Sequence, residues 1–173
     1  MKTSSVVVAL VALFLSVFVE ISTAAERSTG DAEVVVWGMS HHLSAPPEGR
    51  TFNETNPGIG FRKYFASRNN IEVFADAHYV SKNSTSGEAV MVGIGGQYPF
   101  ASMGRVDVLV GGVAGISRYE NTWERKIYVA PGAYPFLGLR WKDVTLTVGY
   151  VPNVSVDGMA TYSTLFAYAS MRF

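Results

Sequence analysis

Histidine is the residue type in this sequence best suited to moving a proton, because imidazole titrates near neutral pH. The chain has three histidines, at positions 41, 42 and 78. His42 ends a predicted strand on the face expected to point inward, whereas His41 falls on the opposite face. His42 is therefore the candidate general base. The alternative is a polar residue at a loop edge with no chemical role.

Asp76 and His78 form a second pair, on one face of another predicted strand. They fit a base with a carboxylate that orients it. A buried interior network with Arg62 and Glu72 uses the same positions and is the favoured interpretation.

Ser84 and Asn83 lie in the polar segment 81–87. The Ser84 hydroxyl can orient an acceptor, donate to an oxyanion or position the histidine, and Asn83 can donate through its amide. The same composition is typical of any hydrophilic hairpin loop, and that is the alternative.

Composition removes several other kinds of chemistry. The chain has no cysteine, which excludes a disulfide framework and a thiolate metal site. Its 14 basic and 14 acidic residues give no basic footprint for nucleic acid. We expect no metal, no cofactor and no nucleic-acid partner.

The N-terminus has the pattern of a secretory signal. Lys2 precedes the apolar run Val6 to Val19, and Ser22-Thr23-Ala24 supplies small residues at a cleavage site. The apolar run of about 14 residues is shorter than the roughly 20 needed for a membrane-spanning helix, which disfavours an anchor. We predict a signal peptide over residues 1–24 and a mature domain over 25–173.

The mature chain alternates bulky apolar residues with polar or small ones, as strands do. Eight segments show the pattern: 33–42, 59–65, 71–79, 88–97, 105–117, 126–141, 143–151 and 161–173. The connectors 67–70 and 98–104 are short, whereas 43–56, 81–87 and 119–125 are mostly longer and more polar. This predicts an all-β fold, an eight-stranded antiparallel up-and-down transmembrane barrel in the cell outer membrane, and a monomer. A soluble β-sandwich is the alternative.

An eight-stranded barrel encloses too little space for a water channel, so its interior is packed or holds a narrow slot. The predicted inward positions mix apolar and charged residues: Val34, Val36, Phe74, Leu109, Val113 and Phe166 with Arg62, Glu72, Asp76, His78 and Asp107. Gly93, Gly95, Gly111 and Gly115 are expected to leave space among them, and its depth would set ligand length. A partly apolar slot in a membrane barrel suggests an acyl chain.

Four prolines lie at or inside the ends of predicted strands: Pro57, Pro131, Pro135 and Pro152. Each removes one ladder hydrogen bond, which opens the wall locally. Pro57 and Pro152 can also be explained as residues that border loops. Pro131 and Pro135 lie within a continuous aliphatic and aromatic stretch.

The order of several segments resembles the lipid A palmitoyltransferase (PagP) family of outer-membrane barrels. The segment Ser40-His41-His42-Leu43 is followed by Phe52-Asn53-Glu54-Thr55-Asn56-Pro57-Gly58, and Lys82-Asn83-Ser84 precedes Gly93 by nine residues. Further on, 112–117, Pro131, Pro135 and 144–152 are similar to the family's later strands. The terminal Phe173 after an alternating strand also resembles the assembly signal of such barrels.

The resemblance implies an acyltransferase that moves a palmitoyl-like chain from a phospholipid to lipid A or a related glycolipid. It implies His42 as base, Ser84 as assisting group, Asn83 as supporting partner, and lateral lipid access at the four prolines. The sequence departs from the family at Asn83, where the family has an acidic residue, and it leaves little room for the family's N-terminal helix.

The sequence leaves two alternatives to the transferase. One is a non-catalytic small barrel that binds lipid or has a structural role, which the missing acidic residue favours. The other is a deacylase or phospholipase on a similar barrel; it requires a histidine and a serine on one outward strand face, and the sequence shows no such pair.

Overall fold

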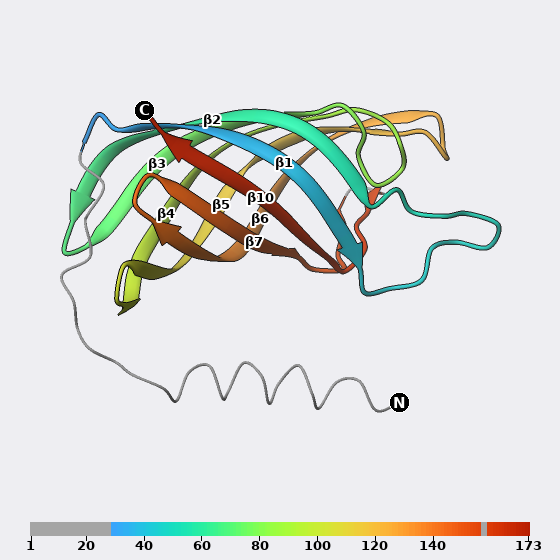
Figure 1. The fold of residues 1–173 in the computed structure, drawn as a ribbon. Helices are drawn as coiled ribbons and strands as arrows, with labels where there is room; N and C mark the ends of the chain where they lie inside the picture. Colours follow the sequence, from blue (N-terminus) through green and yellow to red (C-terminus); the bar gives the residue numbers. More distant parts are fainter. Residues whose placement is uncertain (1–28, 157–158) are drawn as a thin grey trace.

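The structure, a computed structural model, describes residues 29–156 and 159–173 (Figure 1). The predicted signal peptide, residues 1–24, lies outside these residues. Within them, no helix has the length and apolar character needed to cross a membrane.

Eight strands close into one barrel in the order β1-β10-β7-β6-β5-β4-β3-β2 (Figure 1). They are β1 (Ala32–His42), β2 (Thr55–Arg68), β3 (Ile71–Val80), β4 (Ala89–Met103), β5 (Val106–Asn121), β6 (Lys126–Trp141), β7 (Val144–Val151) and β10 (Thr164–Arg172). Neighbouring strands are antiparallel throughout, and β1 pairs with β10 to close the wall. The predicted fold class is confirmed. The small hairpin of β8 (Ser155–Val156) and β9 (Met159–Ala160) was not predicted.

The two ends of the barrel differ (Figure 1). The turn end has tight connections, such as the one at Asn69 and Asn70, whose φ angles of 52° and 62° suit a two-residue hairpin turn. The C-terminus lies at the same end. The loop end carries the connectors 43–54, 81–88 and 122–125 and the described residues 152–156 and 159–163. By the habit of such barrels, the loop end faces the outside.

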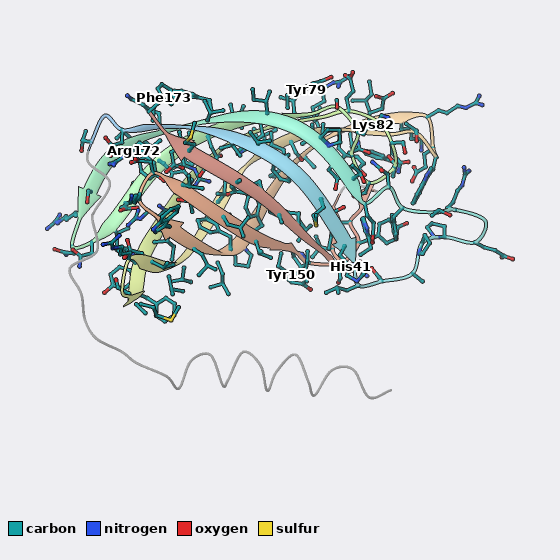
Figure 2. All side chains as sticks on the ribbon, in the orientation of Figure 1. His41, Tyr79, Lys82, Tyr150, Arg172 and Phe173 are labelled. Carbon is teal, nitrogen blue, oxygen red and sulfur yellow. The ribbon has the colours of Figure 1, made fainter. Side chains whose placement is uncertain are left out.

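Large apolar side chains cover the outer wall. Ile59, Val92, Ile94, Leu137 and Leu146 are each about half or more exposed. Tyr79 and Phe173 project from the wall toward opposite ends of the barrel (Figure 2). An apolar outer surface of this size, here called the apolar belt, would promote aggregation in water but is suited to contact with lipid hydrocarbon. The molecule is a small outer-membrane barrel.

Strand β1 changes its register at Gly38. Its pairing with both neighbours shifts between Trp37 and Met39, so Gly38 and Met39 both face outward. Before this bulge the odd-numbered residues point inward, with Val35 fully buried, whereas Val36 is 57% exposed. The prediction that Val34 and Val36 face the lumen was therefore wrong, because one extra residue reverses the alternation. Beyond the bulge, Ser40 is buried again.

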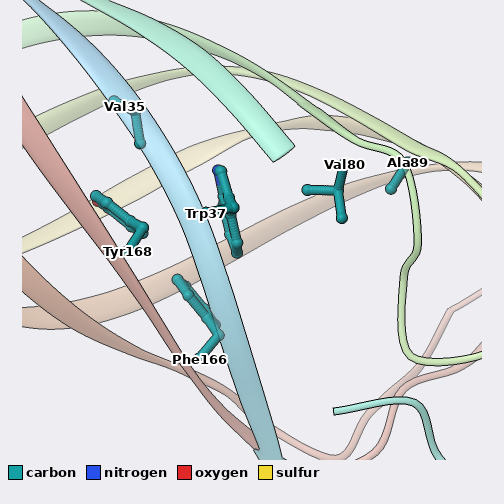
Figure 3. Packing of buried hydrophobic residues seen from close by; sticks show 6 residues of the cluster. All are labelled: Val35, Trp37, Val80, Ala89, Phe166 and Tyr168. Atoms are coloured by element: carbon teal, nitrogen blue, oxygen red, sulfur yellow. The ribbon is translucent and has the colours of Figure 1, made fainter. Parts of the chain in front are cut away.

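The lumen has two zones. Toward the loop end an apolar cluster packs together: Val35, Trp37, Val80, Ala89, Phe166 and Tyr168 (Figure 3). Toward the turn end the interior is filled by a set of buried charged and polar side chains, here called the polar plug: Glu33, Arg62, Tyr64, Glu72, Asp76, His78, Gln97 and Arg140. The apolar zone can therefore hold an apolar ligand, whereas the plug cannot.

Candidate functional site

A cavity of about 220 Å³ lies inside the loop end of the barrel. Its wall is largely apolar and includes Trp37, Val80, Met91 and Phe166. An apolar cavity of about 150 Å³ is enough to bind benzene, so this one has room for a longer hydrocarbon segment. His42, Asn83 and Ser84 line the same cavity. The three residues proposed for chemistry come from a strand end and a loop, and the fold brings them to one place.

Aromatic rings bound the cavity on the side of the polar plug. Trp37 stacks on Phe166 with ring centroids 5.1 Å apart, and Tyr134 meets Phe166 edge-on at 5.0 Å. The Trp37 indole N–H donates to Nδ1 of His78 in the plug at 3.1 Å. This hydrogen bond and the ring contacts fix the rings in place, so they form a rigid floor.

The four glycines expected to set ligand depth do not line the cavity. A Cβ added to Gly95 would lie 2.4 Å from ring carbons of Phe74, and one added to Gly111 would lie 2.4 Å from the Phe136 ring. The space at Gly95 and Gly111 is filled by rings, and that at Gly93 and Gly115 by Val113 and by backbone of the neighbouring strand. The depth of the cavity is therefore set by its aromatic floor.

His42 is held at the rim by two neighbours that sequence reasoning did not single out. Phe52 stacks on the imidazole, with ring centroids 3.7 Å apart and an interplanar angle of 8°. Glu54 accepts a hydrogen bond from the backbone N–H of His42 at 3.2 Å, and its Oε1 lies 3.8 Å from His42 Nδ1. The same Oε1 lies 3.2 Å from Nδ1 of the exposed His41. The signal for Glu54 was present in the sequence as the aromatic-Asn-Glu segment.

The Glu54 carboxylate stays ionised at neutral pH. The backbone N–H of His42 lowers the pKa of Glu54 below its usual value, and the nearby histidines add to the effect. A negative charge thus stands beside the imidazole of His42, where it can stabilise the protonated ring.

Asn83 holds the loop that carries Ser84. Its Nδ2 donates to the carbonyl oxygens of Glu88 at 2.9 Å and Glu120 at 2.8 Å. Its Oδ1 accepts from the backbone N–H of Thr85, at 2.8 Å, and from that of Gly87, at 3.2 Å. With its donors and acceptor engaged, Asn83 fixes the loop that places Ser84 at the cavity.

The prolines lie at different kinds of position. Strand β6 pairs with β5 over its whole length, but its ladder with β7 begins only at Phe136. In the part of the chain that the structure describes, Lys126 to Pro135 therefore has no ladder on the β7 side, and Pro131 and Pro135 lie in this stretch. Pro57 lies where the β1–β2 ladder is irregular, and Pro152 directly follows β7.

Asp76 and His78 belong to the polar plug. Asp76 Oδ2 accepts from Arg62 at 3.0 Å and lies 3.2 Å from Nε2 of His78. Arg62 also donates to the Tyr168 hydroxyl at 2.9 Å, while Glu72 pairs with Arg140 at 2.9 Å. The predicted interior network is confirmed for Asp76, His78 and Arg62, whereas Glu72 pairs with Arg140. Neither Asp76 nor His78 lines the cavity.

No protein-family model matches the sequence, and a comparison with curated proteins finds no match. Among solved structures, the chain is similar to Neisserial surface protein A (NspA), with a TM-score of 0.52, 16% identity, and coverage of 83% of this chain and 95% of that one. It is also similar to Ail, the attachment invasion locus protein of Yersinia pestis, with a TM-score of 0.43, 12% identity, and coverage of 84% and 100%.

The likeness to NspA is one of fold, and it agrees with the closed wall and the apolar belt. It shows the fold alone and carries no evidence for the palmitoyltransferase family. The closed eight-stranded wall and its apolar outer surface show that the chain is a small β-barrel of the outer membrane.

Proposed function

We propose that this barrel binds an acyl chain of a membrane lipid inside its loop end. The observation that carries the proposal is the apolar cavity, which lies between the rim and an aromatic floor. A hydrocarbon chain placed there gains roughly 0.8 kcal/mol for each CH₂ that leaves water. The stretch of β6 that lacks a β7 ladder, with Pro131 and Pro135, is the proposed path of entry from the membrane.

At a finer level, we propose that the barrel is an acyltransferase. The polar residues at the cavity support this: His42 is the proposed base that takes a proton from an acceptor hydroxyl, and Ser84 assists by donating a hydrogen bond to the ester. Asn83 contributes by fixing the Ser84 loop. The donor is a phospholipid with a palmitoyl-like chain, and the acceptor is lipid A or a related glycolipid, as the resemblance to the palmitoyltransferase family implies.

A non-catalytic lipid-binding or structural barrel is the second candidate. The specific observation in its favour is that both polar atoms of the Asn83 amide are engaged by backbone groups of its own loop and of Glu120 in β5. The family's acidic residue before the serine is Asn83 in this chain. This candidate needs the cavity but not His42.

Mass spectrometry of lipids that co-purify with the detergent-extracted protein tests the binding proposal. Met91 lines the cavity, so Met91→Trp should fill it and reduce bound lipid several-fold. Val92 is 51% exposed on the outer wall of the same strand, so Val92→Trp is the matched control and should leave bound lipid unchanged. Equal lipid in the two variants would count against the cavity.

Acyl transfer is tested on lipid A from cells with and without the protein. An added acyl group that disappears in His42→Ala but persists in His41→Ala supports the transferase, because His41 points away from the cavity. An unchanged acyl count together with lipid bound to the purified protein supports the non-catalytic candidate.

A further inference from the structure

A second serine, Ser40, is closer in sequence to the proposed base His42 than Ser84 is. Ser40 and His42 are two residues apart in β1, beyond the bulge, and both line the cavity. Residues at this spacing lie on the same face of a strand with Cα atoms about 7 Å apart, and an imidazole can lean along the strand toward its neighbour. The bulge at Gly38 leaves both residues inward while Trp37 also stays inward.

Two buried atoms of this pair have no hydrogen-bond partner among the described residues. Ser40 is 7% exposed, and its Oγ has none. The His42 side chain is 3% exposed, and its Nδ1 has none. Buried hydroxyl groups are normally satisfied, so the Ser40 hydroxyl at the cavity wall is available to a bound ligand.

Glu54 completes the arrangement. Its backbone carbonyl accepts from the N–H of Ser40 at 2.9 Å, and its carboxylate accepts from the N–H of His42 at 3.2 Å. Its Oε1 stands on the Nδ1 side of the imidazole, at 3.8 Å. Bonds of this kind are often long before substrate binds and tighten afterwards. A carboxylate on the Nδ1 side leaves Nε2 to exchange a proton with a hydroxyl.

We propose that Ser40 is a nucleophile that carries the acyl group, with His42 as its base and Glu54 as the positioning residue for His42. The inference rests on the proposed acyl-chain binding and deepens it. The Ser40 Oγ attacks the carbonyl carbon of a lipid ester and gives its proton to His42 Nε2. The bond from that carbon to the glycerol oxygen breaks, and the leaving oxygen takes the proton from His42. The product is an ester between the acyl group and Ser40.

The second half of the proposed reaction returns the enzyme to its starting state. An acceptor hydroxyl attacks the acyl-Ser40 carbonyl carbon and gives its proton to His42. The bond from the carbonyl carbon to Ser40 Oγ breaks, and Oγ regains the proton. A glycolipid hydroxyl yields an acylated glycolipid, whereas water yields a free fatty acid. Ser84 lines the same cavity and is the proposed hydrogen-bond donor to the oxyanion in both halves of the reaction.

The test traps the acyl-serine. The mature protein in detergent micelles is treated with a p-nitrophenyl ester of a medium-chain fatty acid, followed by intact-mass measurement and peptide mapping. We expect an acyl adduct on the peptide that contains Ser40. It should be absent in Ser40→Ala and form more slowly by a factor of about 100 or more in His42→Ala. An adduct that is missing from wild type, or that persists in Ser40→Ala, overturns the proposal.

Ser44 provides the matched control. Its Oγ is also buried with no hydrogen-bond partner in the described part of the chain, yet Ser44 does not line the cavity. Ser44→Ala should keep the adduct. Removing an unsatisfied buried hydroxyl is close to neutral for folding, so Ser40→Ala should unfold in urea at the same concentration as wild type, or a higher one. Loss of the adduct with stability retained separates a reacting serine from a structural one.

Lipid A analysis separates this inference from the proposed transferase. If Ser40→Ala acylates lipid A fully and His42→Ala does not, the role of Ser40 as nucleophile is contradicted and the proposed transferase activity is supported. An adduct on Ser40 without any acylated glycolipid would uphold the nucleophile and overturn the glycolipid acceptor. Free fatty acid release in that case would identify water as the acceptor.

Discussion

Asn83, the residue that departs from the family pattern, has a structural role in its loop. Its amide donates to two backbone carbonyl groups and accepts from backbone N–H groups of its own loop. An aspartate at this position would have no hydrogens to donate. It would instead place a negative charge against the carbonyl oxygens of Glu88 and Glu120.

We therefore expect Asn83→Asp to destabilise the loop and not to increase activity. The carbonyl groups of Glu88 and Glu120 would each lose one of two donors and would face a negative charge, at a total cost of about 1–3 kcal/mol. Urea unfolding in micelles measures the loss, and the exposed Asn153→Asp is the control. A variant that is as stable as wild type and gains acyl transfer would show that the loop accepts the family's acidic residue.

The convergence of His42 and Ser84 could be predicted from the sequence, because both positions border loops of the same barrel end. The supporting residues could not be assigned in the same way. Glu54 and Phe52 lie in an irregular connector, where no periodicity indicates which side chains turn back toward the strand. Ser40 shares its parity with His42 in the sequence, and that spacing was the signal that could have identified the pair.

At the scale of elements, strand β6 has two different halves. Phe136–Trp141 pairs with both neighbours, whereas Lys126 to Pro135 pairs only with β5. Among residues 29–156 and 159–173, backbone N–H groups on the β7 side of the first half therefore have no strand partner. The two prolines lie in this half, where they cost the fewest ladder bonds.

Hydrogen exchange in micelles should reveal the difference. We expect alternate amides between Lys126 and Tyr134 to exchange roughly tenfold or more faster than the amides of 136–141, because an amide without a ladder partner exchanges without opening the barrel. The fully paired half of the same strand serves as the internal control. Uniform protection along β6 would show that the wall is closed there.

Alternation predicted the eight wall strands, because each has one face in hydrocarbon and one in the lumen. It failed in β1, where a bulge at Gly38 reverses the parity and the sequence gives no sign of the extra residue. It also missed the two-residue strands of the β8–β9 hairpin, which are too short to show a period.

At the scale of the whole molecule, the polar plug is the part of the interior whose burial costs the most desolvation free energy. Arg62 is fully buried, lies 3.8 Å above the Phe74 ring and pairs with Asp76. Arg140 binds both carboxylate oxygens of Glu72 at 2.9 Å. Removing one partner leaves the other as an isolated charge in a space with little water.

Arg62→Ala should therefore destabilise the barrel by about 3–5 kcal/mol, the usual cost of breaking a buried ion pair on one side. Arg68 is exposed at the turn end, so Arg68→Ala should change stability by no more than about 0.5 kcal/mol. Urea unfolding in lipid vesicles measures both. Similar values for the two variants would mean that the plug does not hold the fold together.

The polar plug also blocks the passage of solutes through the barrel. Because charged and aromatic side chains fill its cross-section near the turn end, nutrients, ions and hydrophilic antibiotics find no aqueous route through it. A cell can therefore hold many copies of this protein in its envelope without becoming more permeable, and electrical recordings across planar bilayers should show no steady conductance from it.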